Sequence, residues 1–143
     1  HIIIRFELER DLFAGKIKID ELPEAWKQKY QDYLGVEVQN DSEGVMQDTH
    51  WASGLFGYFP SYALGNIYDG QIYDAITKDV PDWKTQLSEG NLSDVNRWLK
   101  TSIHDRGDLY DPEDLIKLAT GSNLTSKPFI RYLSEKYSEL YGF

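Results

Sequence analysis

The stretch Pro60–Ile76, PSYALGNIYDGQIYDAI, decides the fold class of this chain. Its apolar side chains recur at the three- and four-residue intervals of a single helix face, at Leu64, Ile67, Tyr68, Ile72, Ala75 and Ile76. Proline is well tolerated in the first turn of a helix, because the amide groups there have no partner within the helix. The stretch therefore predicts a long helix that begins at Pro60.

Helical spacing also dominates the rest of the chain. Before Pro60 it predicts a helix over residues 2–13, followed by Gly15, and a second helix from Pro23 to Gly35. Residues 35–45 are polar and contain glycine, which is typical of a loop.

Shorter helices are expected after the long one. The sequence predicts them at 81–90, at 93–107 with Ser93 as the N-cap, at 111–121, and from about Ser126 onward. No run of four or more residues alternates between apolar and polar in the manner of a strand. The predicted fold class is therefore all-α.

Composition restricts the possible functions. The 143 residues suit one domain or one lobe of a larger one, and the net charge of −9 argues against binding to nucleic acid or an anionic membrane. The absence of cysteine excludes disulfides, thiol catalysis and cysteine-bound metals. The same lack of cysteine fits a reducing cytoplasm, which is the location we expect. We find no apolar run long enough to span a bilayer and no signal-peptide pattern.

The start of the chain has the character of an interior segment. His1 leads at once into IIIRFELE, which has no capping residue and carries apolar side chains on more than one side. We therefore expect the chain to be truncated.

Groups capable of chemistry gather in a glycine-rich, aromatic stretch between Gly44 and Tyr62. Within it, His50, Tyr58 and Tyr62 could each donate a hydrogen bond to a developing oxyanion. The alternative is purely structural: a buried histidine bonded to a carbonyl, and interior tyrosines with a polar end. The residues alone leave both interpretations open.

A metal site is not expected in this chain. The three histidines lie at positions 1, 50 and 104, and none belongs to the His-Glu-x-x-His pattern of helical zinc sites. An independent metal hydrolase built on His50 and Asp48 has too few ligands. On the first helix, Arg5 and Glu9 are one turn apart and are expected to form a surface ion pair, so Glu7 and Glu9 are assigned structural roles.

The string GVMQDTHW, Gly44–Trp51, resembles the Gly-x-x-Gln-Asp-x-His-Trp motif of the thermostable (Taq-type) zinc metallocarboxypeptidase family. Further runs extend the resemblance over essentially the whole chain: IRFELE at 4–9, LPEAW at 22–26, GYFPSYALGN at 57–66, HDRG at 104–107 with Tyr110 and Pro112, ATG at 119–121, and Lys136-Tyr137.

The resemblance implies a much longer, mostly helical homodimer that removes C-terminal residues from peptides. It would use one divalent metal, zinc or another such as cobalt. Residues 1–143 would form a single C-terminal helical lobe, because the family's His-Glu-x-x-His helix and third ligand lie upstream of this sequence. We therefore expect the isolated chain to be inactive and to hold no metal.

The resemblance also implies roles for residues in the motif region. Tyr58 and Tyr62 are the candidate oxyanion donors, and His50 is the expected contact to the substrate backbone. The residues expected to support the loop are Gln47, Asp48 and Trp51, with Asp48 orienting His50.

Two further expectations follow from truncation. One face of the helix at 2–13 and part of 44–62 should be bare or paired with another copy of the chain. The competing hypothesis is a stand-alone helical module that binds a partner or stabilises an assembly without catalysis.

Overall fold

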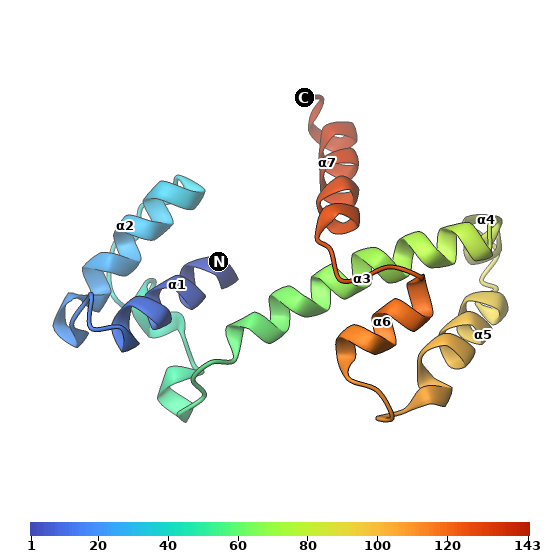
Figure 1. Ribbon diagram of the computed structural model, residues 1–143. Coiled ribbons are helices and arrows are strands. Elements are labelled where there is room, and N and C mark those ends of the chain that lie inside the picture. The colour runs from blue at the N-terminus through green and yellow to red at the C-terminus, as the bar shows by residue number, and fades with distance from the viewer. The chain divides into compact units, whose positions relative to one another are not determined.

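The computed structural model describes residues 1–143 and contains helices and turns but no strand, which confirms the all-α prediction (Figure 1). The chain divides into two compact units, His1–Leu64 and Gly65–Phe143. The long helix α3 (Phe59–Asp79) contributes residues to both. It begins one residue before the predicted Pro60. That residues 1–143 form a single lobe stays a prediction.

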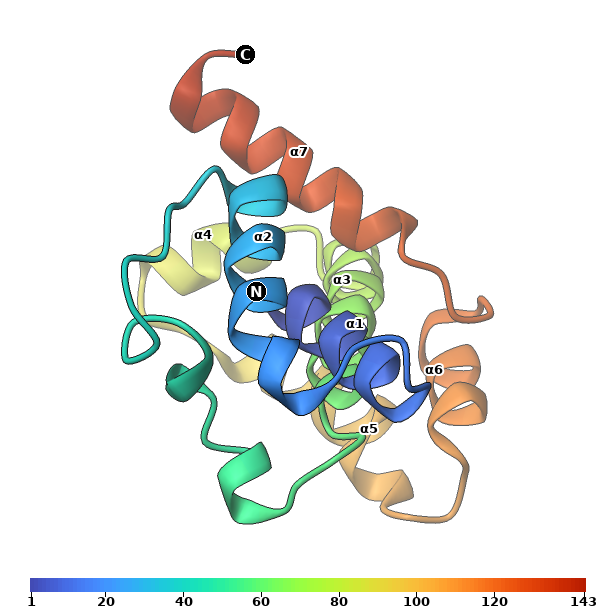
Figure 2. The same cartoon turned by 90° about the vertical axis from the view of Figure 1, so that its left-hand side faces the viewer.

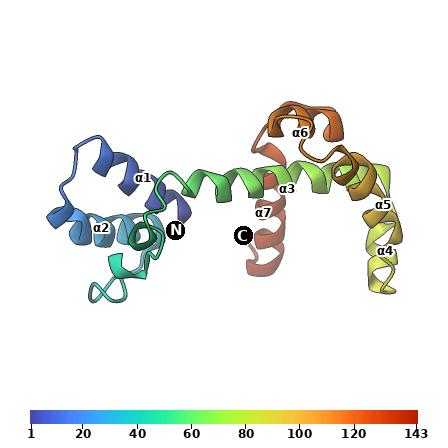
Figure 3. The same cartoon turned by 90° about the horizontal axis from the view of Figure 1, so that it is seen from below.

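Two helices form the frame of the first unit. Helices α1 (Ile2–Phe13) and α2 (Leu22–Leu34) lie side by side, as Figures 1 and 3 show. Both end as predicted, α1 shortly before Gly15 and α2 at Gly35, whose φ of 64° is readily adopted only by glycine.

The core of the first unit is built around one tryptophan. Trp26 is fully buried, as are Ile4 and Leu8, and Leu22 is nearly so. Its ring stacks on Tyr30 with centroids 5.0 Å apart, and the ring of Trp51 meets it edge-on at 6.1 Å. Burying aromatic side chains of this size contributes much of the stability of a small core.

The segment between α2 and α3 has little regular structure, and the predicted loop at 35–45 is confirmed. It contains two short 3₁₀ turns, η2 (Val45–Gln47) and η3 (Trp51–Ser53). Glycine is favoured at position 44, the first residue of the motif, because there is little room for a side chain. A Cβ there would lie 2.8 Å from Cγ1 of Val38.

The second unit contains the remainder of α3 and four further helices: α4 (Trp83–Ser88), α5 (Ser93–Ser102), α6 (Pro112–Thr120) and α7 (Lys127–Tyr141). In Figure 2, where α3 is seen nearly along its axis, the connection from α6 leads into α7. The buried Gln71 of α3 holds this connection by donating to Ser122 and Asn123 and accepting from the amide of Thr125.

Two sequence-based expectations about α5 need correction. Ser93 is the first residue of the helix rather than its N-cap, and its amide donates to Oδ1 of Asn91 at 3.0 Å. The helix ends at Ser102, not near Gly107, because Ile103 leaves helical geometry and a separate 3₁₀ turn, η4 (His104–Arg106), follows. None of the helices has the length and apolar character needed to cross a membrane.

Candidate functional site

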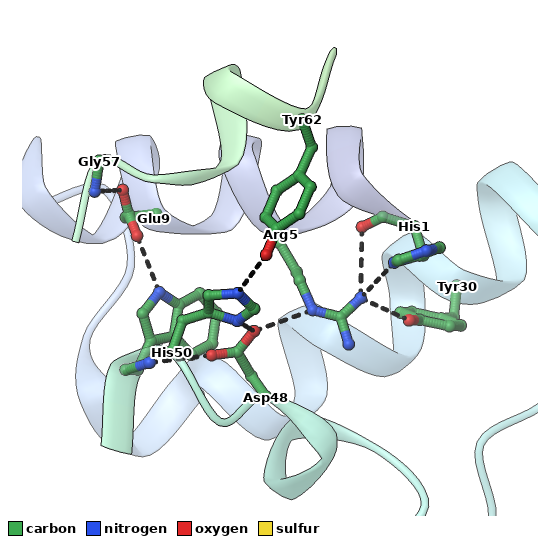
Figure 4. A network of polar contacts seen from close by, with 9 residues as sticks. His1, Arg5, Glu9, Tyr30, Asp48, His50, Gly57 and Tyr62 are labelled. Atoms are coloured by element: carbon green, nitrogen blue, oxygen red, sulfur yellow. Dashed lines mark hydrogen bonds and ion pairs between the residues drawn. The ribbon is translucent and has the colours of Figure 1, made fainter. Parts of the chain in front are cut away.

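The residues of the motif region meet the first helix in a dense network of polar contacts (Figure 4). The network lies within the first unit. It joins α1, α2, the loop around η2 and η3, and the beginning of α3.

Asp48, between the two 3₁₀ turns, is the central acceptor. Its side chain is completely buried. Oδ2 accepts from Nε of Arg5 at 2.9 Å, and Oδ1 accepts from the amide of Trp51 at 2.9 Å. Each oxygen therefore faces an N–H donor, an arrangement that suits an ionised carboxylate.

Arg5 connects this carboxylate to the second helix. Its Nη1 donates to the hydroxyl of Tyr30 at 3.2 Å, and its guanidinium lies 4.7 Å from the ring centre of Trp26. Arginine suits this position because its planar fork can pair with a carboxylate and stack on an aromatic ring at once.

His50 lies between Asp48 and Tyr62. Its Nδ1 is 3.4 Å from Oδ2 of Asp48, and its Nε2 is 3.2 Å from the hydroxyl of Tyr62. The ring also packs edge-on against Phe59, with centroids 5.0 Å apart. The structure thus brings together His50, Asp48 and Tyr62, which the sequence had singled out.

The two candidate tyrosines differ in their hydrogen bonding. Their rings meet edge-on, with centroids 5.3 Å apart. In the sequence they stand on either side of Phe59, which is buried. Both are exposed, Tyr58 by 45% and Tyr62 by 42%. The hydroxyl of Tyr62 is paired with His50, whereas that of Tyr58 makes no hydrogen bond within the chain.

Glu9 is a site residue that sequence reasoning missed, and the expected Arg5–Glu9 ion pair is wrong. Arg5 pairs with Asp48 instead. Glu9 is only 6% exposed; its Oε2 accepts from the indole of Trp51 at 2.9 Å and its Oε1 from the amide of Gly57 at 2.5 Å. The sequence held one indication that Glu9 is buried: it directly follows Leu8, a core residue on the side of α1 that faces inward.

Gln47 makes its hydrogen bond away from the histidine. Its Nε2 donates to the carbonyl of Ser42 at 2.5 Å, within the loop that precedes η2. Its expected part in supporting the loop stays a prediction, and this contact is compatible with it. Trp51 contacts both carboxylates of the network, Asp48 through its amide and Glu9 through its indole.

Comparison with known proteins gives the family of the chain. The sequence pattern of the family described as Carboxypeptidase Taq (M32) metallopeptidase matches residues 1–137. The chain belongs to the M32 metallopeptidase family.

Curated M32 relatives resemble the chain over nearly its whole length. Carboxypeptidase 1 of Bacillus subtilis (strain 168) is 47% identical over 141 residues, which is 99% of this chain. Thermostable carboxypeptidase 1 of Thermus thermophilus is 42% identical over 142 residues, again 99% of the chain. In both cases the chain spans only 28% of the relative's length.

Solved M32 structures share the arrangement of the helices. The M32 carboxypeptidase from Deinococcus radiodurans R1 matches all of this chain with a TM-score of 0.95 at 38% identity. The carboxypeptidase of Pyrococcus furiosus matches 96% of it with a TM-score of 0.91 at 39% identity. The matched part is 29% and 28% of those chains, respectively.

The residues of this chain do not fit a metal centre of the kind an M32 metallopeptidase requires. No group of three or more His, Asp or Glu side chains in the structure is arranged so that it could hold a metal ion. The network around Asp48 uses its carboxylates to hold N–H donors. We therefore derive no metal-dependent step from this chain.

Proposed function

We propose that this chain is the C-terminal part of a zinc-dependent metallocarboxypeptidase that removes C-terminal residues from peptides, and that it supplies hydrogen-bond donors to the substrate. Membership of the M32 family and the names of the relatives support the reaction. The observation that carries the contribution of this chain is the cluster of the exposed Tyr58 and Tyr62 with the half-buried His50. The buried carboxylates of Asp48 and Glu9 hold the loop that carries this cluster.

In this proposal Tyr58 is the donor to the oxyanion that forms when the peptide carbonyl is attacked. Its hydroxyl is free, whereas that of Tyr62 is paired with His50. A donor already in place where charge develops needs no reorganisation during the reaction, so it lowers the barrier. His50 then acts on the substrate backbone through Tyr62, whose oxygen can still accept an N–H of the substrate beside it.

Asp48, Trp51 and Gln47 act on this site through the loop. Asp48 holds Arg5 and the amide of Trp51, and it faces the imidazole of His50. The indole of Trp51 is tied to Glu9. A donor group is useful in catalysis only if its position is fixed before the substrate arrives, and these contacts supply that fixation.

The metal belongs to the remainder of the enzyme in this proposal. The ligands for zinc, or for another divalent metal such as cobalt, come from residues outside this chain, and the isolated chain is inactive. The family resemblance suggests a homodimer, and the cysteine-free composition fits a cytoplasmic location.

The second candidate function is a helical interaction module without catalysis. An exposed apolar groove in the first unit favours it: Ile2, Ile3, Phe6, Pro60 and Leu64 are among the residues that line it. In an intact metallocarboxypeptidase, the same groove would be covered by the rest of the enzyme.

Release of C-terminal amino acids from a peptide separates the two functions. We expect the longer gene product that contains this sequence to release them in the presence of a divalent metal, and the 143-residue chain to release none. A gene product no longer than this chain, with no peptidase activity, would favour the interaction module.

A further inference from the structure

We propose that Arg5 is a positioning residue that sets the protonation of the His50 ring through Asp48. In this arrangement the proton of the neutral imidazole lies on Nδ1, facing the carboxylate, and Nε2 accepts the hydroxyl proton of Tyr62. The four side chains form one continuous line of contacts (Figure 4). The effect on turnover rests on the proposed function, whereas the position of the proton does not.

The first step is the anchoring of Arg5. Its side chain is 12% exposed. Nε donates to Asp48, Nη1 donates to Tyr30, and the face of the guanidinium lies over Trp26. Because these contacts use different parts of one rigid plane, the guanidinium cannot turn away from the carboxylate without losing several of them.

The second step is the fixed orientation of the carboxylate. Arg5 binds Oδ2 and the amide of Trp51 binds Oδ1, both at 2.9 Å. A carboxylate held at both oxygens cannot rotate about its terminal bond. Oδ2 of Asp48 therefore stays 3.4 Å from Nδ1 of His50.

The third step is the choice between the two neutral forms of the ring. A proton on Nδ1 presents the positive end of an N–H bond to Oδ2, whereas a lone pair there would face negative charge. The Asp48 side chain is completely buried, so water screens this difference poorly. In a neutral histidine, the partner of one ring nitrogen decides which nitrogen carries the proton.

The consequence reaches the two tyrosines. With the proton on Nδ1, Nε2 has only a lone pair to offer, and the hydroxyl of Tyr62 at 3.2 Å must be the donor. The hydroxyl of Tyr58 makes no hydrogen bond in the chain, so Tyr58 is then the phenol that is free to donate a hydrogen bond to a substrate. Arg5 thus affects the donors without touching the substrate.

Long-range ¹H–¹⁵N correlation spectra of the labelled 143-residue chain, at a pH high enough for neutral imidazoles, report which nitrogen of His50 is protonated. The chain has three histidines, so His50→Gln and His104→Gln variants assign the signals by the loss of one set each. We expect wild-type His50 to be protonated mainly on Nδ1. In Asp48→Asn, which removes the charge, the population should move toward the form protonated on Nε2. In Arg5→Met the carboxylate is no longer held at Oδ2, so the population should depart from the wild-type ratio, and Arg5→Lys should fall between Arg5→Met and the wild type.

Lys29→Met is the matched control, because Lys29 of α2 pairs with Glu7 of α1, the helix that carries Arg5, but stands outside this line of contacts. It should leave the His50 spectrum unchanged. In the intact enzyme, Arg5→Lys should lower kcat roughly 10–100-fold with a smaller change in KM, the loss seen when the hydrogen-bond partners of metal-binding histidines are removed.

A wild-type His50 protonated on Nε2 would overturn the proposal, and so would a folded Arg5→Met chain with an unchanged spectrum. If Arg5→Met does not fold, the wild-type spectrum and that of Arg5→Lys decide in the same way. The role of Tyr58 in turnover is tested separately by kinetics, so either idea can fail without the other.

Discussion

The indole nitrogen of Trp51 donates a 2.9 Å hydrogen bond to Oε2 of Glu9, 42 residues earlier in the chain. The other oxygen of the same carboxylate accepts the amide of Gly57, which lies just before Tyr58. One buried side chain of α1 therefore fixes both ends of the segment that runs from η3 to the first candidate tyrosine.

Glu9→Gln should destabilise the first unit. The glutamine would keep one acceptor oxygen but place an NH₂ group against a donor, either the indole or the amide. We expect the free energy of unfolding in urea to fall by about 1–3 kcal/mol, the usual penalty for leaving a buried polar group unpaired. Glu24→Gln, on the exposed side of α2, is the control, and equal stability of the two variants would contradict the assignment.

The two glycines of α3 at 65 and 70 should respond oppositely to alanine. A Cβ at Gly70 would lie 2.6 Å from the backbone nitrogen of Phe129, whereas a Cβ at Gly65 would meet nothing within 4 Å. We expect Gly70→Ala to lower the free energy of unfolding by about 1–3 kcal/mol through overpacking. Gly65→Ala should raise it by up to about 1 kcal/mol through helix propensity. Chemical denaturation of both variants measures this, and a stable Gly70→Ala chain would refute the close helix crossing.

Stability should depend on pH through Glu7. Hydrogen bonds from Lys29 and then Tyr33 lower the pKa of the Glu7 carboxyl, and its ion pair with Lys29 adds to the effect. A carboxyl whose pKa is lower in the folded state stabilises the fold above its ordinary pKa, and this contribution is lost as pH falls through the folded value.

In Glu7→Gln, the free energy of unfolding should therefore fall less steeply than in the wild type as the pH is lowered below about 5. The effect should be modest and should weaken with salt, because the pair lies near the surface. Unfolding curves between pH 3 and 7 test this. Parallel profiles for the wild type and Glu7→Gln would show that the pair contributes nothing.

The apolar groove of the first unit should make the isolated chain bind hydrophobic dyes and self-associate. The expectation of exposed apolar surface on α1 and the motif region is confirmed, with Ile3 at 59%, Phe6 at 40% and Phe56 at 51% exposure. Ile3→Ser combined with Leu64→Gln should reduce dye binding with little change in stability. Leu109→Ser, at a still more exposed position outside the groove, should not reduce it.

Local sequence pattern was sufficient to predict the helices. The long helix begins within one residue of Pro60, and α2 ends at Gly35. These ends are predictable because proline and glycine restrict or relax the backbone locally, independently of tertiary packing. The end of α5 was missed, since no proline or glycine marks the departure at Ile103.

The candidate site was predicted in part. Asp48 and His50 are close in sequence within the motif, and Tyr62 lies in the first turn of α3, only 12 residues after His50, so their meeting depends on a short segment of chain. Asp48, the carboxylate partner of Arg5, and both hydrogen-bond donors to Glu9 lie more than 40 residues away. The four-residue spacing of Arg5 and Glu9 shows only that the two side chains could pair with each other. In the folded chain each is largely buried against a distant segment and pairs with a residue there instead.

The turnover of the intact enzyme carrying Tyr58→Phe tests the central claim most directly. Its control is Tyr141→Phe, which removes the same hydroxyl from an exposed tyrosine at the end of α7. If Tyr58 donates to the oxyanion, kcat should fall about 10²–10³-fold, the loss typical of removing one such donor, while the control keeps full activity. Unchanged kcat in Tyr58→Phe would contradict the role assigned to this tyrosine.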